Sequence, residues 1–506
     1  MDVAHPSSPR YGQHWTAEAV RAKFAPAPES IRAVRAWLSA SGVDGGRVQE
    51  TNNKGWLAID LPVHVAESLL RTEYHEYDQD QDGTVRLGCD GYHLPQTLAK
   101  HVDFVKPGIT LTPPLRKKTL KRDGSTASYG GRHHYGNPWN PHSNPPFFRP
   151  PYRGPHHLPP NSNQLPPELQ TCNYNITPTC IRALYHIPNL TLTHPVNSLG
   201  VYGQSPGFSQ EDLDEFFAAF APKVTKSAAG TEANIDLDLA MSLVYPQTVT
   251  LYLFGTITVN YTDAEVEDTV TFLDPFLDSN DGSFRTSAEQ SAGLACGTLE
   301  LTRVTSFSYD GDEVSIAGQP VQERTCNKIM KLGLQGHTFV VSSGDNGVGG
   351  VQPNAGENGC IASDLSSLTN GTVFSPTFPA KCPYVLAVGA TQLDDQTVLG
   401  SESVWDFYQE AIDLGGASGG SAGDYQKAAV SGYLNSYVPD YPSYTYNGID
   451  TFNNGSNIGT GGGLYNPAGR GIPDVSADGA SLTLFVNGRE QNTFGTSLAA
   501  QSGVRS

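Results

Sequence analysis

The sequence predicts an α/β protein with a mostly parallel sheet flanked by helices, preceded by a small α+β domain. Two observations lead to this prediction. From about residue 168 onward, helical patterns alternate with apolar, β-rich runs, as in repeated strand–helix–strand units. The 506 residues also exceed what one hydrophobic core usually holds, so more than one domain is expected.

The composition narrows the classes of partner. The net charge is −19 at pH 7, and only 16% of the residues are charged. This acidic balance argues against nucleic acid or an anionic membrane surface as a partner. No run of 18 apolar residues occurs, so no membrane span is predicted. Few basic residues beside many carboxyls suit a protein that works in acid, where acidic self-repulsion is relieved.

Residues 1–105 are predicted to form the small α+β domain. Its expected elements are helices at 16–24, 28–42 and 64–77 and a strand at 56–63. The composition changes over 106–167, which begins with the basic run 116–122 and continues rich in Pro, Asn, His and Gly. Such a segment cannot bury a core, so we expect an extended linker. Its histidines lack an organised ligand spacing, and Lys121-Arg122 is a candidate processing site.

Residues 168–506 have the composition of a globular domain. Ser209, followed by Asp212, resembles a capping box that opens a helix. The predicted helices are 211–220, 231–246 and 326–336, and the predicted strands are 197–203, 248–255, 269–274, 337–345 and 381–390. This alternation is the basis for the parallel sheet.

The helix at 231–246 is the first candidate for chemistry. Its apolar residues recur at helical spacing, and Pro246 ends it. Glu232 and Asp236 are four residues apart, so they lie on one side of the first turns. Two such carboxylates are tolerated if they are solvated, or if they share a proton and do chemistry. Taken alone, a solvated acidic turn is the simpler interpretation.

Two later residues are also candidates. Asp345 stands where an apolar strand enters a glycine-rich turn, and active sites of parallel sheets lie at that end of the strands. An aspartate that only satisfies turn amides would look the same. Ser497 follows Gly495 and Thr496 and precedes small helix-forming residues. A serine on a glycine turn that opens a helix is accessible, with backbone N–H groups beside it.

In this order, Glu-x-x-x-Asp on a helix, Ser-Gly-Asp after a strand and a late Gly-Thr-Ser resemble the sedolisins, or serine-carboxyl peptidases. The resemblance covers nearly the whole chain. HPSSPRYGQHW resembles the family's activation prodomain, TCNYNITPTCIRALYHIP the start of its catalytic domain, and GRGIPDVSADG a later segment of it. The resemblance implies a subtilisin-like sheet and a ferredoxin-like prodomain, and it is strongest to secreted members of the tripeptidyl-peptidase type.

The resemblance implies a role for each candidate. Ser497 would be the nucleophile and Glu232 its general base. Asp236 would hold and tune Glu232, and a protonated Asp345 would donate a hydrogen bond to the oxyanion. A subtilisin would need Asp-Thr-Gly and His-Gly-Thr, and neither motif occurs. The expected enzyme hydrolyses peptide bonds at acidic pH, releases tripeptides from free N-termini and is made as a zymogen.

This interpretation assigns residues 1–105 to the prodomain, 106–167 to a linker with the processing region, and 168–506 to the peptidase domain. The expected partners are a peptide or protein substrate and the chain's own prodomain as an intramolecular inhibitor. Neither nucleic acid nor a membrane is expected as a partner, and the protein is expected to be a monomer.

The cysteines and sequons favour secretion. The seven cysteines show no paired metal-ligand spacing. Cys172–Cys180 could close a short loop, and Cys296–Cys326 with Cys360–Cys382 is one pairing of the others, although sequence does not fix connectivity. Five sequons fit a glycosylated, extracellular protein, at Asn175, Asn189, Asn260, Asn370 and Asn454.

The sequence departs from the family pattern in three places. Gln501 stands where family members have proline, the calcium expected from the family would need ligands beyond Ser506, and no signal peptide opens the chain. We therefore expect both ends to be incomplete. The alternatives are a truncated, catalytically inactive homologue that folds as an unprocessed proprotein, and a glycoprotein that acts only by binding.

Overall fold

A computed structural model describes most of the chain. The described residues are 2–51, 53–78, 85–109, 166–172, 175–194, 196–204, 209–224, 231–254, 258–261, 264–267, 273–281, 300–312, 319–345, 360–362, 370–393, 402–404, 426–436 and 469–503. They fall into two compact units. Most of the predicted linker and the Lys121-Arg122 pair lie outside the described residues.

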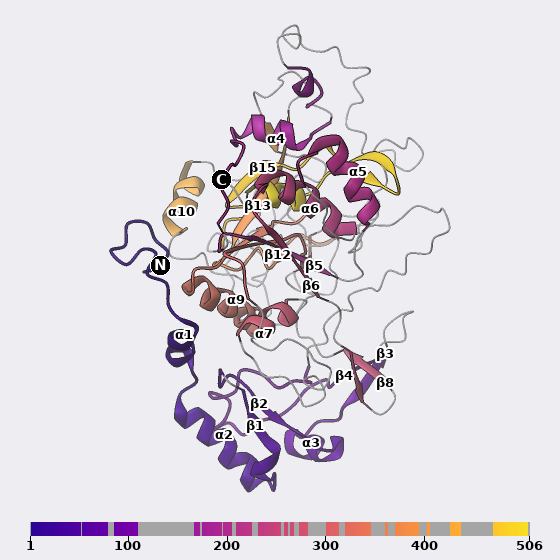
Figure 1. The fold of residues 1–506 in the computed structure, drawn as a ribbon. Coiled ribbons are helices and arrows are strands. Elements are labelled where there is room, and N and C mark those ends of the chain that lie inside the picture. Colours follow the sequence, from indigo (N-terminus) through magenta and orange to yellow (C-terminus); the bar gives the residue numbers. More distant parts are fainter. Residues whose placement is uncertain are drawn as a thin grey trace. The chain divides into compact units, whose positions relative to one another are not determined.

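The larger unit comprises Lys118–Leu253, Thr302–Ser315 and Thr338–Ser506 and contains a seven-stranded sheet. The strand order is β14-β13-β11-β9-β5-β6, and β15 also pairs with β13. Figure 1 labels β5, β6, β13 and β15 of this sheet. The strands are β5 (Leu199–Gln204), β6 (Val249–Phe254), β9 (Val304–Phe307), β11 (Thr338–Ser342), β13 (Leu386–Leu393), β14 (Glu402–Val404) and β15 (Val475–Asp478). Strands β5, β9, β11, β13 and β15 pair in parallel, and β14 is antiparallel. The predicted parallel α/β sheet is confirmed.

The remaining elements of this unit surround the sheet. The helices are η3 (Pro167–Leu169), α4 (Pro178–Leu184), α5 (Gln210–Phe220), α6 (Thr231–Val244), α10 (Lys427–Ser436) and α11 (Thr496–Gly503). Two short antiparallel pairs complete it, β10 (Gly311–Asp312) with β12 (Thr377–Phe378) and β16 (Leu482–Val486) with β17 (Arg489–Thr493). Ser209 Oγ accepts a hydrogen bond from Asp212 N at 3.2 Å, which is the side-chain cap expected for α5.

Helix α6 is buried on more than one face. Leu237, with Ala240 and Val244, belongs to one apolar cluster with α5 and β5. Ile235, Leu239 and Leu243 belong to a second cluster, which includes residues of α4 and Leu498 of α11. A helix buried all round must carry apolar residues on every side, so the few polar side chains on it are buried as well.

Helix α11 lies close to both α6 and the sheet, in contact with β9, β11, β13 and β15. Its residues are small, and Ala499 and Ala500 are fully buried against Val388 and Ala477 of the sheet. Small side chains allow the helix to approach the strands closely. This packing brings the start of α11 to the carboxyl ends of the central strands.

The smaller unit comprises Met1–Lys117, Phe254–Leu301 and Ile316–His337. Its helices are α1 (Ala17–Phe24), α2 (Pro28–Ala40), η1 (Gly45–Arg47), α3 (Val63–Leu70), α7 (Asp274–Asp281) and α9 (Gln319–Leu334). Its strands are β1 (Val48–Glu50), β2 (Leu57–Ile59), β3 (His75–Asp78), β4 (Val85–Gly88), β7 (Thr258–Tyr261) and β8 (Ala264–Glu267). β1 pairs with β2, and a separate sheet has the order β3-β4-β8-β7.

The α+β character of the N-terminal region is therefore present, with its described strands in two sheets instead of one. The predicted helix at 64–77 is wrong beyond Leu70. Arg71 adopts a left-handed conformation with φ 49°, which ends α3, and the chain then enters β3. The predicted strand at 269–274 falls largely outside the described residues, and Asp274 begins α7.

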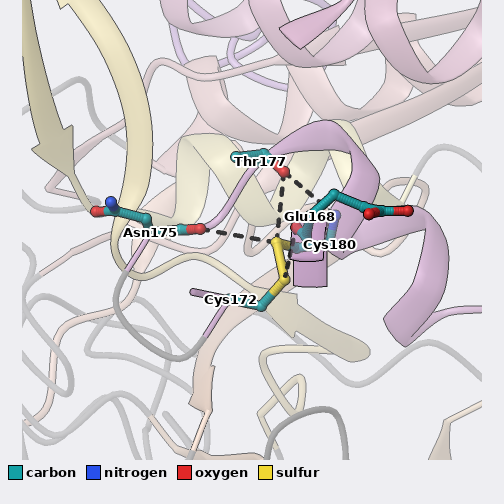
Figure 2. The surroundings of a disulfide bond; sticks show 5 residues. All are labelled: Glu168, Cys172, Asn175, Thr177 and Cys180. Atoms are coloured by element: carbon teal, nitrogen blue, oxygen red, sulfur yellow. Dashed lines mark hydrogen bonds between the residues drawn. A yellow bond between two sulfur atoms is a disulfide. The ribbon is translucent and has the colours of Figure 1, made fainter. Parts of the chain in front are cut away.

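The Cys172–Cys180 disulfide is present, and Figure 2 shows it beside Thr177 at the start of α4. Thr177 Oγ1 accepts a hydrogen bond from Cys180 N at 3.4 Å, so the bridge closes a loop onto a capped helix. The suggested Cys360–Cys382 pair is wrong, because Cys382 is disulfide-bonded while Cys360 keeps a buried thiol. Cys296 lies outside the described residues, so its suggested pairing with Cys326 is not described.

Candidate active site

Ser497 lies in the first turn of α11. Its Oγ donates a hydrogen bond to the backbone oxygen of Ser308 at 3.4 Å. Ser308 follows directly after β9, which lies between β5 and β11 in the sheet. The serine is thus at the carboxyl end of a central parallel strand, where the topology of such sheets gathers functional groups.

Asp236 lies on α6 and is completely buried. Ser308 Oγ donates a hydrogen bond to its Oδ1 at 2.6 Å, while Oδ2 has no hydrogen-bond partner among the described residues. Burial raises the pKa of Asp236 from its ordinary 3.8 to about 7, although hydrogen bonding by Ser308 and the nearby Gln501 amide lowers it. The interpretation of a solvated acidic turn is therefore wrong for Asp236.

Asp345 follows β11 by three residues and binds the residue before Ser497. Its Oδ1 accepts hydrogen bonds from Thr496 N and from Thr496 Oγ1, both at 2.7 Å. Thr496 Oγ1 also accepts a hydrogen bond from Gly344 N at 3.2 Å. These bonds tie the end of β11 to the start of α11.

Glycine is required where these two segments meet. Gly495 has φ +147°, and a Cβ there would lie 3.0 Å from Asp345 Oδ2. Gly344 has φ +103°, and a Cβ there would lie 2.5 Å from Thr377 Cγ2. Because side chains at either position would be strained or would clash, the glycines permit the close approach of Asp345 to α11.

Glu232 lies in the first turn of α6, four residues before Asp236. Its backbone is helical, and its side chain lies outside the described residues. Helical spacing places the two carboxyl-bearing residues on the same side of the helix. The structure thus links Ser497 and Asp236 through Ser308, and it links Asp345 to the residue beside Ser497.

Three residues of this site were not singled out from the sequence: Ser308, Thr496 and Gln501. Ser308 ends the β-rich run RVTSFS, and its place at the end of a strand was the signal that could have identified it. Gln501 drew attention only as a departure from the family pattern. No local pattern in the sequence marks its amide as a neighbour of Ser308.

The calcium expected from the family is not placed in the described part of the chain. There, no group of three or more His, Cys, Asp or Glu side chains is arranged to hold a metal ion.

The structure describes only some of the predicted carbohydrate sites. Asn189 and Asn370 are exposed, and Asn175 is half-buried and accepts a hydrogen bond from Asn492 at 2.9 Å. The Asn260 side chain and Asn454 lie outside the described residues.

The described helices include none that is both long and apolar enough to cross a membrane.

The site combines a serine at the start of a helix with a buried carboxyl and a second carboxyl bound beside that serine. No histidine takes part in the contacts that link them. The site therefore brings carboxyl groups to a serine at the start of a helix.

Comparison with known proteins gives the family. The model of the pro-kumamolisin activation domain matches residues 1–111. Aorsin of Aspergillus oryzae is 35% identical, with 99% of this chain and 77% of that protein covered. Tripeptidyl-peptidase sed1 of Aspergillus fumigatus is 32% identical with the same coverage. A solved structure of Pseudomonas sedolisin, a serine-carboxyl proteinase, is 17% identical with a TM-score of 0.40 and covers 66% of this chain and 79% of that one. The chain belongs to the sedolisin family of serine-carboxyl peptidases and carries an activation domain.

Proposed function

We propose that the protein cleaves peptide bonds in acid with Ser497 as nucleophile, Glu232 as general base, Asp236 as the residue that tunes Glu232, and Asp345 as oxyanion donor. The main observation behind this proposal is that Asp236 and Ser497 both form a hydrogen bond with Ser308. Asp236 is also fully buried, and its pKa is raised to about 7. A carboxylate of ordinary pKa is too weak a base to activate serine, and a coupled carboxyl pair relieves this weakness.

The bonding of Asp345 supports its role as a donor. Its Oδ1 accepts two hydrogen bonds from Thr496, which fix the side chain beside Ser497. The proposed oxyanion donor is Oδ2, which faces Gly495 at the start of α11.

The finer assignments belong to the same proposal. Tripeptide release from free N-termini is supported by the names of relatives such as tripeptidyl-peptidase sed1. The Cys172–Cys180 disulfide and the exposed sequons at Asn189 and Asn370 support secretion as a glycoprotein. Calcium and a monomeric state are proposed from family membership alone. The boundaries 1–105, 106–167 and 168–506 remain those proposed from the sequence.

The test uses the full chain after activation at acidic pH. A tripeptide amide substrate with a free N-terminus should be cleaved, and Ser497→Ala should abolish turnover. The same substrate with an acetylated N-terminus separates the two modes of action. No cleavage of the acetylated form supports release of tripeptides, whereas equal cleavage indicates an endopeptidase. Undiminished turnover by Ser497→Ala would refute the proposed function.

The zymogen part of the proposal is supported by contacts within the smaller unit. Arg324 of α9 stacks over the Trp56 ring, with its guanidinium carbon 4.1 Å from the ring centroid. Lys331 of α9 lies 5.6 Å from the centroid of the Phe24 ring. Trp15 N donates a hydrogen bond to Leu334 O at 2.8 Å. One helix from beyond the linker thus contacts several aromatic residues of the activation domain.

Acid incubation of the full chain tests this part. We expect cleavage within about 106–170, which N-terminal sequencing locates, and slow release of the cleaved prodomain. Because a cation–π contact contributes about 0.5–2 kcal/mol, Arg324→Ala should release the prodomain roughly 2- to 30-fold faster. Arg324→Lys keeps the cation and is the matched control. A single uncleaved band with full activity would contradict the zymogen assignment.

A further inference from the structure

We propose that Ser308 and Gln501 are positioning residues that hold Asp236 and favour its charged form beside Ser497. This inference rests on the proposed function, because it assigns residues that act through Asp236. The Ser308 backbone oxygen contacts Ser497 Oγ, and the side chains of Ser308 and Gln501 are proposed to act through Asp236.

Ser308 makes two hydrogen bonds, one through its side-chain hydroxyl and one through its backbone oxygen. Its hydroxyl donates to Asp236 Oδ1 at 2.6 Å, and its backbone oxygen accepts from Ser497 Oγ at 3.4 Å. Because the hydroxyl donates this bond, the bond favours the charged form of the carboxyl. One residue at the end of β9 therefore fixes the distance between the buried carboxyl and the nucleophile.

Gln501 lies one helical turn after Ser497 on α11 and is only 2% exposed. Its Nε2 donates to Ser308 Oγ at 3.4 Å, and its Oε1 has no hydrogen-bond partner in the described part of the chain. An amide donor that approaches the Ser308 hydroxyl orients that hydroxyl's own proton toward Asp236. Burying an amide with only its nitrogen hydrogen-bonded costs free energy. The contact of the Gln501 amide with Ser308 gives a reason why Gln501 is buried at this position.

Few charged residues near Asp236 could stabilise its charged form in place of Ser308 and Gln501. Helix α11 carries no titratable side chain. On α4, Arg182 donates to Ser242 O at 2.7 Å and Leu243 O at 3.0 Å, at the far end of α6. The titratable residues on the elements packed around Asp236 are Arg182 on α4, Tyr202 on β5, Glu211, Asp212, Asp214 and Glu215 on α5, Glu232 and Asp238 on α6, and Tyr309 and Asp310 after β9. Burial raises the pKa of Asp236 and hydrogen bonding by Ser308 and Gln501 lowers it, and none of these causes is a cation.

Ser308→Ala removes a hydrogen bond to an ionised carboxyl. We expect kcat to fall about 10- to 100-fold with little change in KM. The acid limb of the pH–rate profile should move up by about one pH unit, because the charged form of Asp236 loses a donor. Ser308→Thr keeps the hydroxyl and should restore the parent limb. Gln501→Met should give a smaller shift in the same direction.

Ser306→Ala is the matched control. Ser306 lies on β9, two residues before Ser308, is fully buried, and its hydroxyl has no hydrogen-bond partner among the described residues. Its loss should leave the pH profile unchanged. Parent-like profiles for both Ser308→Ala and Gln501→Met, in a protein that Ser497→Ala inactivates, would overturn the positioning role alone. An active Ser497→Ala variant would instead overturn the proposed function. If Ser308→Ala does not fold, Gln501→Met decides the question.

Discussion

Two aspartates in the larger unit, the fully buried Asp236 and the half-buried Asp474, are held in opposite ways. Asp474 is bonded to the guanidinium of fully buried Arg470, to the Gln426 amide and to Ala387 N at 2.8 Å. Burial raises the pKa of Asp474, and the nearby guanidinium and these hydrogen bonds offset part of that rise. Asp236 has a hydroxyl as its hydrogen-bond donor and no countercharge among the causes of its shift.

The difference separates a structural carboxyl from one suited to chemistry. Arg470 also donates to Ala380 O at 3.1 Å and to Val385 O at 3.0 Å, so the Asp474 pair ties the loop before β13 to the chain before β15. A carboxylate with a fixed cation stays charged and keeps its place. Asp236 lacks that cation, so its charge can change within the range of pH in which a peptidase works.

The largest expected effect is on turnover. Asp236→Asn keeps the shape of the side chain but cannot exchange a proton with Glu232, so kcat should fall about 10²- to 10⁴-fold in an acidic assay. Asp474→Asn, measured in the same assay on the folded fraction, should keep kcat near the parent value. Equal losses in the two variants would remove the distinction between these two sites.

The next effect is on stability. Asp474→Leu leaves the Arg470 guanidinium buried without its countercharge, which should cost about 3–5 kcal/mol in the free energy of unfolding. The double variant Arg470→Met/Asp474→Leu removes both charges and should recover part of this loss. Urea unfolding at pH 5 measures both. A Leu variant as stable as the parent would show that the ion pair is not needed.

The smallest effect concerns the pH dependence of stability. The folded-state pKa of Asp236 is raised to about 7 from 3.8, so folding favours the protonated form. The stability this gives is complete below about pH 3.8 and is lost as the pH rises toward 7. Asp236→Asn cannot ionise, so its stability relative to the parent should increase from pH 4 to pH 7. Urea midpoints at pH 4, 5.5 and 7 measure this change, and parallel curves would contradict the raised pKa.

The order and type of the main elements followed from the sequence alone. Apolar spacing predicted α5, α6 and the strands β5, β11 and β13 because each pattern is local. The sequence also identified Glu232, Asp236, Asp345 and Ser497 as candidates, since each stands at a recognisable position on a helix or at the end of a strand. The helix at 64–77 was overextended, because its apolar and charged residues do not reveal that Arg71 turns left-handed.

Only the tertiary structure decided which carboxyls are buried and what they contact. The sequence could not distinguish a solvated Asp236 from a fully buried one, because burial depends on α4, α5, α11 and β5 closing around α6. The Ser308 and Gln501 contacts arise for the same reason, since residues 72 and 193 positions apart from their partners meet only when the sheet has formed. Local patterns set the elements, and long-range packing set the charge state and partners on which the chemistry depends.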